Sequence, residues 1–290
     1  MIRVTIAGGT WAAVDKLAGA LAGQGVRVRV LTENPLRARE NYDRGNVEYM
    51  AIHLEDPLSL RVAFQDTDRA FLAGGDRERP SRYDLALIDA AVRAEVPYLV
   101  NLSEGGGCVG QSARLWQSET DIHLAAQGVT TTRIHPALSL DAVFAVAAQF
   151  VPPGLWGGTA SSGQAALVDL RDVVSAVARI LLEGAEGHGG KIYHLNGPAA
   201  VTMGYIADYL AENLSRRVRY HHRGEDEQRT IYQQAGLLTP RIDALLEQDN
   251  LIRHGFYADT SADLFDLNHR PARTAIAWIK EHRGDFSHGQ

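Results

Sequence analysis

The stretch MIRVTIAGGTWAAVDKLAGALAGQG, residues 1–25, decides the fold of this chain. An apolar run over residues 2–6 leads into a tight turn at Ala7-Gly8-Gly9-Thr10, and apolar residues with helical spacing follow until Gly25. A second strand-like run begins at once, over residues 26–31. The succession of strand, glycine turn, helix and strand predicts the first βαβ unit of a dinucleotide-binding fold.

The glycine turn departs from the pattern that holds a pyrophosphate. In G-x-x-G-x-x-G, the glycines permit the bend, the close approach of backbone to pyrophosphate, and the packing of helix on strand. Only Gly8 matches, because Trp11 and Val14 occupy the other two positions. An indole at residue 11 stands where the pyrophosphate normally lies, and Asp15 is expected to place a carboxylate in the first helical turn. The pattern predicts the fold, but it favours a protein without a bound cofactor. If the chain does bind a nucleotide, we expect Gly8, Thr10 and Trp11 to contact it.

Composition places the chain among globular proteins. It has 290 residues, of which 45% are hydrophobic and 22% charged, and this length suits one large α/β domain with a smaller lobe. The formal net charge of −6 argues against binding to nucleic acid. The single cysteine, Cys108, excludes an internal disulfide and favours a reducing cytoplasm. With an opening core strand and no long apolar stretch, we expect no signal peptide, no membrane partner and a cytoplasmic location.

Strand-like and helix-like segments alternate through the first half. Further strands are expected over 47–50, 69–72, 98–102 and 130–134, separated by helices that include Pro57, residues 82–94 and a segment ending at Gly128. This alternation predicts an α/β fold with a doubly wound parallel sheet.

The second half reads as a smaller α/β lobe. Residues 166–184 predict a short strand and an amphipathic helix, residues 191–220 predict strand, turn, helix and strand with Thr202 as the helix N-cap, and residues 225–290 predict helices. We expect a Rossmann-type domain over 1–150 and a substrate lobe over 151–290, folded against it as a single compact unit.

The carboxyl ends of the expected strands are where α/β proteins bind ligands. Glu33 follows the second strand, where an acid can hold a ribose and favour NAD over NADP, although a solvated loop explains it equally well. Gly74 follows the fourth strand. The glycine-rich loop over 103–110 follows the fifth strand, and is expected to be either a lid or an ordinary surface loop.

Several blocks of sequence carry a family resemblance over nearly the whole chain. They are the turn at residues 6–9, HLEDPLSL, LIDAAVRAEVPYLVNLS, LAAQGVTTTRIHP, VDLRDVVSAVARIL, and KIYHLNGPAAVT with the downstream RRVRY. In these blocks the chain resembles the NmrA-like family of atypical short-chain dehydrogenase/reductases. The resemblance implies a Rossmann domain, a small α/β lobe, a substrate cleft between them, and NADPH or NADH as the cofactor if the turn still binds one.

The chain departs from the family at positions that carry chemistry. The Tyr-x-x-x-Lys pair of short-chain dehydrogenases falls at Ala113 and Gln117, neither of which can move a proton in its place. The arginine of the family's L-R-P block is His135, and NADP-binding members often carry an arginine where Glu33 stands.

Through the resemblance, a cleft at the carboxyl edge is expected to hold the candidate site residues. The catalytic candidates are His135, Glu119 and Ser103, and the substrate-binding candidates are Trp116, Glu104 and Tyr232. A structural role is the alternative to a functional one for these residues: His135 can be an ordinary strand-end residue, Glu119 a solvated helix charge, and Trp116 a core aromatic. No metal site is expected, because the histidines lack metal-ligand spacing.

Three functions remain open. The first is cofactor-independent acid–base chemistry, such as isomerisation, cyclisation or dehydration, on an aromatic or polyketide-type small molecule, and the departures in the turn favour it slightly. The second is an NAD(P)H-dependent ketone or quinone reductase. The third is a non-enzymatic nucleotide or metabolite sensor. The partner expected is a small-molecule substrate, and a homodimer stays open.

Overall fold

The computed structural model describes residues 2–9, 11–34, 46–74, 80–102 and 111–286, without the side chains of residues 11, 80–81 and 111–118. The chain forms two compact units. Unit 1 comprises Met1–Glu104, Arg114–His135 and Val173–His194, and unit 2 comprises Gly105–Ala113, Pro136–Asp172 and Leu195–Gln290.

The division expected at residue 150 differs from these units. The chain leaves unit 1 after His135 and returns to it at Val173, before leaving it again after His194. The reason is strand pairing, since the carbonyls of Lys191 and Leu195 accept the N–H groups of Arg133, in the strand that ends at Pro136, and of Ala137, directly after it. Neither unit is therefore a continuous half of the chain.

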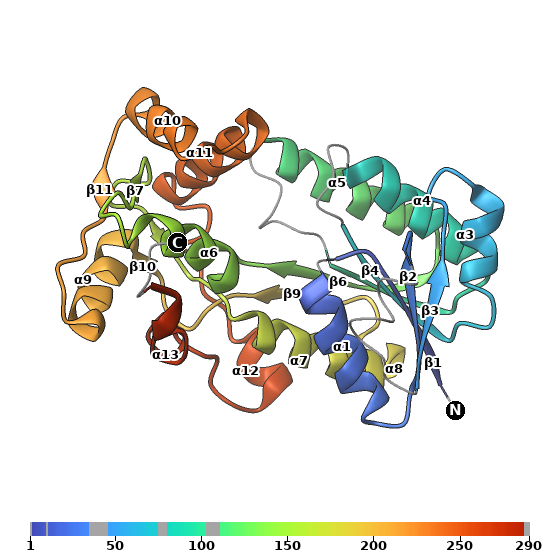
Figure 1. Ribbon diagram of the computed structural model, residues 1–290. Coiled ribbons are helices and arrows are strands. Elements are labelled where there is room, and N and C mark those ends of the chain that lie inside the picture. Colours follow the sequence, from blue (N-terminus) through green and yellow to red (C-terminus); the bar gives the residue numbers. More distant parts are fainter. Residues whose placement is uncertain (1, 10, 35–45, 75–79, 103–110, 287–290) are drawn as a thin grey trace. The chain divides into compact units, whose positions relative to one another are not determined.

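Unit 1 is built on one parallel sheet (Figure 1). Among the described residues its seven strands lie in the order β3 (Val47–Ala51), β2 (Arg27–Thr32), β1 (Arg3–Ala7), β4 (Arg69–Ala73), β5 (Tyr98–Leu102), β6 (Thr130–Pro136) and β9 (Ile192–Leu195). The N–H groups of Arg133 and Ala137 donate to the carbonyls of Lys191 and Leu195, so β9 runs parallel to β6. The strand order changes direction between β1 and β4. In sheets of this kind, ligands bind in a crevice at that point, beside the carboxyl ends of the strands. The predicted doubly wound α/β fold is confirmed.

Helices cover both faces of this sheet (Figure 1). One face carries α3 (Pro57–Ala63), α4 (Pro80–Arg93) and α5 (Gln111–Ala126), and the other carries α1 (Trp11–Ala22), α7 (Leu170–Glu183) and α8 (Ala185–His188). On the first face, Phe64, Ile88, Leu99 and Leu124 are almost fully buried in one cluster. Strands covered on both faces must be apolar on both, which explains the continuous burial of β5.

Asp56 and Thr202 each cap a helix N-terminus, and the cap predicted at Thr202 is confirmed. Asp56 caps α3 by accepting the N–H of Leu58, with Pro57 at the first helical position, where its missing N–H costs nothing. Thr202 caps α9 (Met203–Leu214) by accepting the N–H of Tyr205.

The expectation for Asp15 is wrong. Helix α1 begins at Trp11, so Asp15 is its fifth residue and the first turn holds no acidic side chain. No carboxylate of that turn therefore neutralises the positive end of the α1 dipole.

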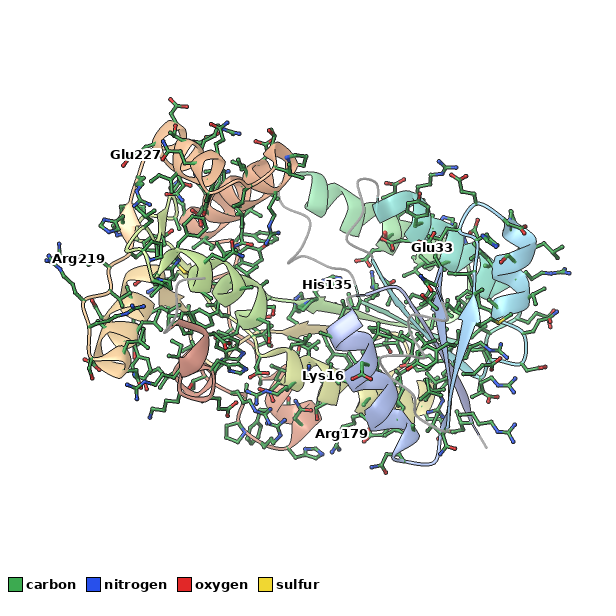
Figure 2. All side chains as sticks on the ribbon, in the orientation of Figure 1. Lys16, Glu33, His135, Arg179, Arg219 and Glu227 are labelled. Atoms are coloured by element: carbon green, nitrogen blue, oxygen red, sulfur yellow. The ribbon has the colours of Figure 1, made fainter. Side chains whose placement is uncertain are left out.

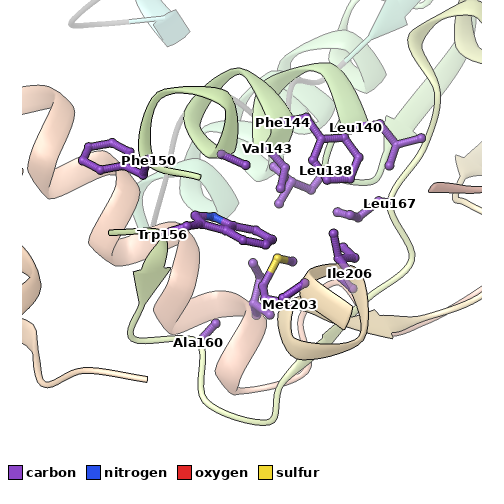
Figure 3. Packing of buried hydrophobic residues seen from close by; sticks show 14 of the residues in the cluster. Leu138, Leu140, Val143, Phe144, Phe150, Trp156, Ala160, Leu167, Met203 and Ile206 are labelled. Carbon is purple, nitrogen blue, oxygen red and sulfur yellow. The ribbon is translucent and has the colours of Figure 1, made fainter. Parts of the chain in front are cut away.

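Unit 2 packs its elements around a large apolar cluster. Its helices are α6 (Leu140–Phe150), α9, α10 (Glu225–Gln234), α11 (Thr239–Arg253), α12 (Asp263–Asn268), α13 (Ala275–Glu281) and the 3-10 turn η1 (Arg283–Phe286), with short strands β7 (Gly157–Gly158), β8 (Gln164–Ala165), β10 (Val201–Thr202) and β11 (His221–His222). Figure 3 shows Trp156 and Met203 packing among side chains of α6 and α9. Phe144 stacks on Trp278 with ring centroids 4.8 Å apart, which ties α6 to α13.

Two expected strands of the second half are shorter than predicted or lie elsewhere. Residues 166–169 form only one bridge, between Val168 and Ser139. The strand expected to end at Tyr220 is instead β11, which pairs in parallel with β7.

Within the described residues, no helix has the length and apolarity needed to cross a membrane.

Candidate active site

The turn between β1 and α1 is shaped by two glycines. Gly8 and Gly9 have φ of +79° and +86°, in the region that favours glycine. A Cβ on Gly8 would lie 1.8 Å from the carbonyl oxygen of Ala73, so only glycine lets the turn approach β4. The N–H of Gly9 donates to the carbonyl of Gly74 over 3.3 Å, which fixes the turn to the end of β4.

This turn leads directly into the N-terminus of α1. The first N–H groups of a helix have no partner within the helix, and they point toward an anion placed at its end. Because the first turn of α1 contains no acidic residue, its dipole remains available to a phosphate. The geometry fits a nucleotide pyrophosphate. Thr10 and the Trp11 side chain lie outside the described residues, so the predicted obstruction by the indole stays a prediction.

Two predicted cofactor residues lie at the same edge of the sheet. Glu33 is exposed directly after β2 (Figure 2), and the N–H of Asn34 donates to Thr32 Oγ1 over 3.1 Å. Gly74 directly follows β4. A Cβ on Gly74 would lie 3.4 Å from Asp84 Oδ2, which places the Asp84 carboxyl against the backbone of this edge.

Sequence reasoning missed Asp84. Burial raises the pKa of its carboxyl to about 6, so the group changes charge near neutral pH. The sequence did contain a signal, because Asp84 precedes the fully buried Ile88 and Ala91 by four and seven residues. That spacing puts an acid on the apolar stripe of α4.

A second group of polar side chains gathers around the ends of β5 and β6. His135 Nε2 lies 3.3 Å from Asp121 Oδ2 of α5, and Arg133 Nη1 lies 3.5 Å from the same oxygen. Arg133 and His135 are two residues apart on β6, so they share the face of the sheet that α5 covers. Asn101 of β5 is the register partner of Arg133 and is only 3% exposed. The ring of His194 on β9 meets His135 edge to face, with centroids 5.4 Å apart.

Unpaired polar atoms concentrate in this group. Among the described residues, Asn101 Nδ2 and Asp121 Oδ1 are buried without a hydrogen-bond partner, and the buried His135 Nε2 contacts Asp121 Oδ2 without the geometry of a hydrogen bond. A buried polar atom without a partner costs about 1–3 kcal/mol, and such atoms are rare outside functional sites and sites that bind water. We therefore take Asn101, Asp121 and His135 as the candidate catalytic cluster.

The predicted site residues fall into three groups. His135 joins the cluster, at the end of β6 (Figure 2), whereas the partner it contacts is Asp121 and not Glu119, which is exposed on α5. Ser103, Glu104 and the Trp116 side chain lie outside the described residues. Tyr232 lies in unit 2. Reasoning from sequence missed Asn101 and Asp121, since strand register and the facing helix decide what surrounds His135.

Tyr232 belongs to a buried polar group of unit 2. It is 4% exposed on α10, and its ring packs against Phe150 with centroids 5.4 Å apart. Tyr220, Tyr232 and Asp249 line a cavity of about 30 Å³, room for about one water molecule. Burial raises the pKa of both tyrosine hydroxyls above their usual range. The substrate-binding role expected of Tyr232 stays a prediction.

We expect the buried Asp249 carboxyl to make stability depend on pH. Its Oδ2 accepts the N–H of Thr159 over 2.6 Å, but burial dominates and raises the carboxyl pKa to about 6. The folded state then holds a proton that the unfolded state releases between about pH 4 and 6, so stability falls as pH rises through that window.

We expect Asp249→Asn to remove this dependence. Between pH 4.5 and 7.5, the free energy of unfolding should fall by about 1–3 kcal/mol more in the unsubstituted protein than in the variant. Urea denaturation of both proteins at both pH values measures this difference. The other titrating groups contribute equally in the two proteins, so their contributions cancel. Equal changes in both proteins would contradict the assignment.

Metal ligation has no support in the described part of the chain, where no three His, Cys, Asp or Glu side chains are grouped to hold an ion.

Comparison with known proteins identifies the family. A model of the NmrA-like family matches residues 2–119. The (4-alkanoyl-5-oxo-2,5-dihydrofuran-3-yl)methyl phosphate reductase of Streptomyces griseus is 31% identical over 292 aligned positions, covering 99% of both chains. The chain belongs to the NmrA-like family.

Two solved structures of reductases share the fold of this family member. The NADPH-dependent quinone oxidoreductase of Escherichia coli, complexed with NADPH, superposes with a TM-score of 0.87 at 22% identity, covering 96% of this chain and 99% of that one. The Citrobacter triphenylmethane reductase, complexed with NADP(H), gives a TM-score of 0.86 at 20% identity, covering 96% of this chain and 99% of that one. At these identities the likeness establishes the fold.

Proposed function

We propose that the chain is an NAD(P)H-dependent reductase of small conjugated carbonyl compounds. The observation that carries the proposal is the turn at Gly8 and Gly9, which leads into a helix N-terminus free of acidic side chains. Gly8, Gly9 and the first N–H groups of α1 would hold the pyrophosphate, and Glu33 would face the adenosine ribose. The proposal replaces the expectation that no cofactor is favoured, which depended in part on the wrong placement of Asp15.

The relatives support this alternative over cofactor-independent chemistry. The Streptomyces protein is named a reductase of a dihydrofuranone, the Escherichia protein a quinone oxidoreductase, and the Citrobacter protein a triphenylmethane reductase. The 4-alkanoyl-5-oxo-dihydrofuran and the quinone share a C=C bond that conjugation with a carbonyl group makes electron-poor. For this chain we propose a substrate whose C=C bond is conjugated with a carbonyl group.

A bound nicotinamide would supply a hydride, which brings two electrons and one hydrogen to the electron-poor carbon. The electrons then move onto the substrate carbonyl oxygen, and one proton completes the reduction. His135 would deliver that proton, and the Asp121 carboxylate would stabilise the charged imidazole while it holds it. The Asn101 amide would donate a hydrogen bond to the developing oxyanion, as side-chain amides do in oxyanion holes.

Titration calorimetry with NADPH and with NADH tests the proposal first. We expect micromolar binding of at least one nucleotide, followed by its oxidation when a substituted benzoquinone or an acyl butenolide is added. Glu33→Gln should weaken NADH and strengthen NADPH, because a carboxylate accepts ribose hydroxyls but repels a 2′-phosphate. Trp11→Gly tests the indole, since tighter binding by the variant would show obstruction. No binding of either nucleotide at millimolar concentration would refute the proposed function.

A further inference from the structure

A groove of about 340 Å³ lies on unit 2, beside the segment that joins α9 to β11. Three of its lining residues are apolar and buried, Val151, Trp156 and Val218, and we call them the floor of the groove. Arg217, Arg219 and His221 line its rim. The volume falls at the lower end of the range for small-molecule sites, which is about 300–1,000 Å³.

The backbone explains why these three basic side chains share one groove. The N–H of His221 donates to the carbonyl of Trp156 and the N–H of Arg223 to that of Gly158, which pairs β11 with β7. Burial alternates before this pairing, with Arg217, Arg219 and His221 exposed and Val218 buried between them. Side chains at alternate positions of an extended chain point the same way. Residues 217, 219 and 221 therefore face outward together, while the ring of Tyr220 packs inward on Trp156, with centroids 5.2 Å apart.

The rim is electropositive in a protein of formal net charge −6. None of the residues lining the groove, all of them within the described part of the chain, is acidic. The neighbouring Arg216 and Arg223 are engaged, the first with the carbonyl of Phe286 and the second with Gln228. Within the same described residues, the Arg217 and Arg219 guanidinium groups have no hydrogen-bond or ion-pair partner, and Figure 2 shows Arg219 extending away from the ribbon.

We propose that this groove binds a phosphate monoester with a small apolar body. Two guanidinium groups match the two charges of a phosphate monoester and can bind its oxygens in pairs. The floor of Val151, Val218 and Trp156 accommodates an aryl or short alkyl group. The site consists only of residues of unit 2, and it does not depend on the proposed reductase function.

Calorimetry with phenyl phosphate at low ionic strength tests the proposal. We expect binding at least about tenfold tighter than that of inorganic phosphate, because the ring adds apolar contact, and none by benzyl alcohol, which lacks the charge. Arg217→Gln and Arg219→Gln should each weaken phenyl phosphate about tenfold, and the double variant about 100-fold. Both side chains are exposed, so the variants should fold, which their thermal melting will check.

Arg253→Gln is the matched control. Arg253 is an exposed arginine of the same unit that contacts only Asn250 among its described neighbours, and its loss should leave phenyl phosphate binding unchanged. Equal binding by the unsubstituted protein and the Arg217→Gln/Arg219→Gln variant would overturn the proposal, as would no binding at all. Tighter binding of a short single-stranded DNA than of phenyl phosphate would overturn it as well, by showing a general polyanion surface.

Discussion

The Gly8→Ala variant is expected to bind NADPH about 100-fold more weakly than the unsubstituted protein, because a misplacement of the turn by about 1 Å is enough for such a loss. A Cβ on residue 8 would lie 1.8 Å from the carbonyl oxygen of Ala73, and backbone on both sides must shift to relieve the contact. The positive φ of +79° adds strain for any residue with a Cβ. We expect a destabilisation of about 2–4 kcal/mol, measured by urea denaturation beside the NADPH titration.

Gly25→Ala separates backbone strain from the steric clash. Gly25 has nearly the same φ, +77°, but a Cβ there would meet nothing within 4 Å. This variant should lose about 1 kcal/mol of stability and keep its NADPH affinity. If Gly8→Ala and Gly25→Ala behaved alike, the close approach of the turn to β4 would not matter for the nucleotide.

The fold was predictable because its signals are local. The period of the apolar residues, the glycine turn and the cap at Thr202 each depend on a few neighbouring residues. The unit boundaries were not predictable in this way. The return of β9 to the sheet depends on pairing with β6, which is remote in sequence, so no local composition marks it.

The candidate site was predictable only in part, for a related reason. His135 stands out because it ends a strand at the carboxyl edge, where ligands bind. Its contact with Asp121 and the proximity of Asn101 depend on strand register and on how α5 lies across the sheet, and neither can be read from spacing. At Asp15 a local signal misled the prediction. Placing the helix start a few residues too late put this carboxylate in the first turn, where it would have neutralised the helix dipole, whereas α1 begins at Trp11.

His135→Ala is expected to lower kcat for reduction of the conjugated substrate by about 10²- to 10³-fold, with little change in NADPH affinity, because the variant removes the proposed proton donor. Added imidazole should restore part of this activity. Asp121→Asn should lower kcat about tenfold and leave the KM for NADPH unchanged, since it acts through His135. Stopped-flow measurement of NADPH oxidation separates these effects from binding.

A second His–Asp pair of unit 1 supplies the control. His123 Nε2 contacts Asp89 Oδ1 at 2.7 Å, but His123 sits in the last turn of α5. Asp121 and His123 are two residues apart on α5, so their side chains point about 200° away from each other around the helix, and His123 faces α4 and not the cluster at His135. His123→Gln should therefore keep kcat within about twofold. Equal losses in His123→Gln and His135→Ala, without imidazole rescue, would mean that the histidine at the end of β6 only supports the fold.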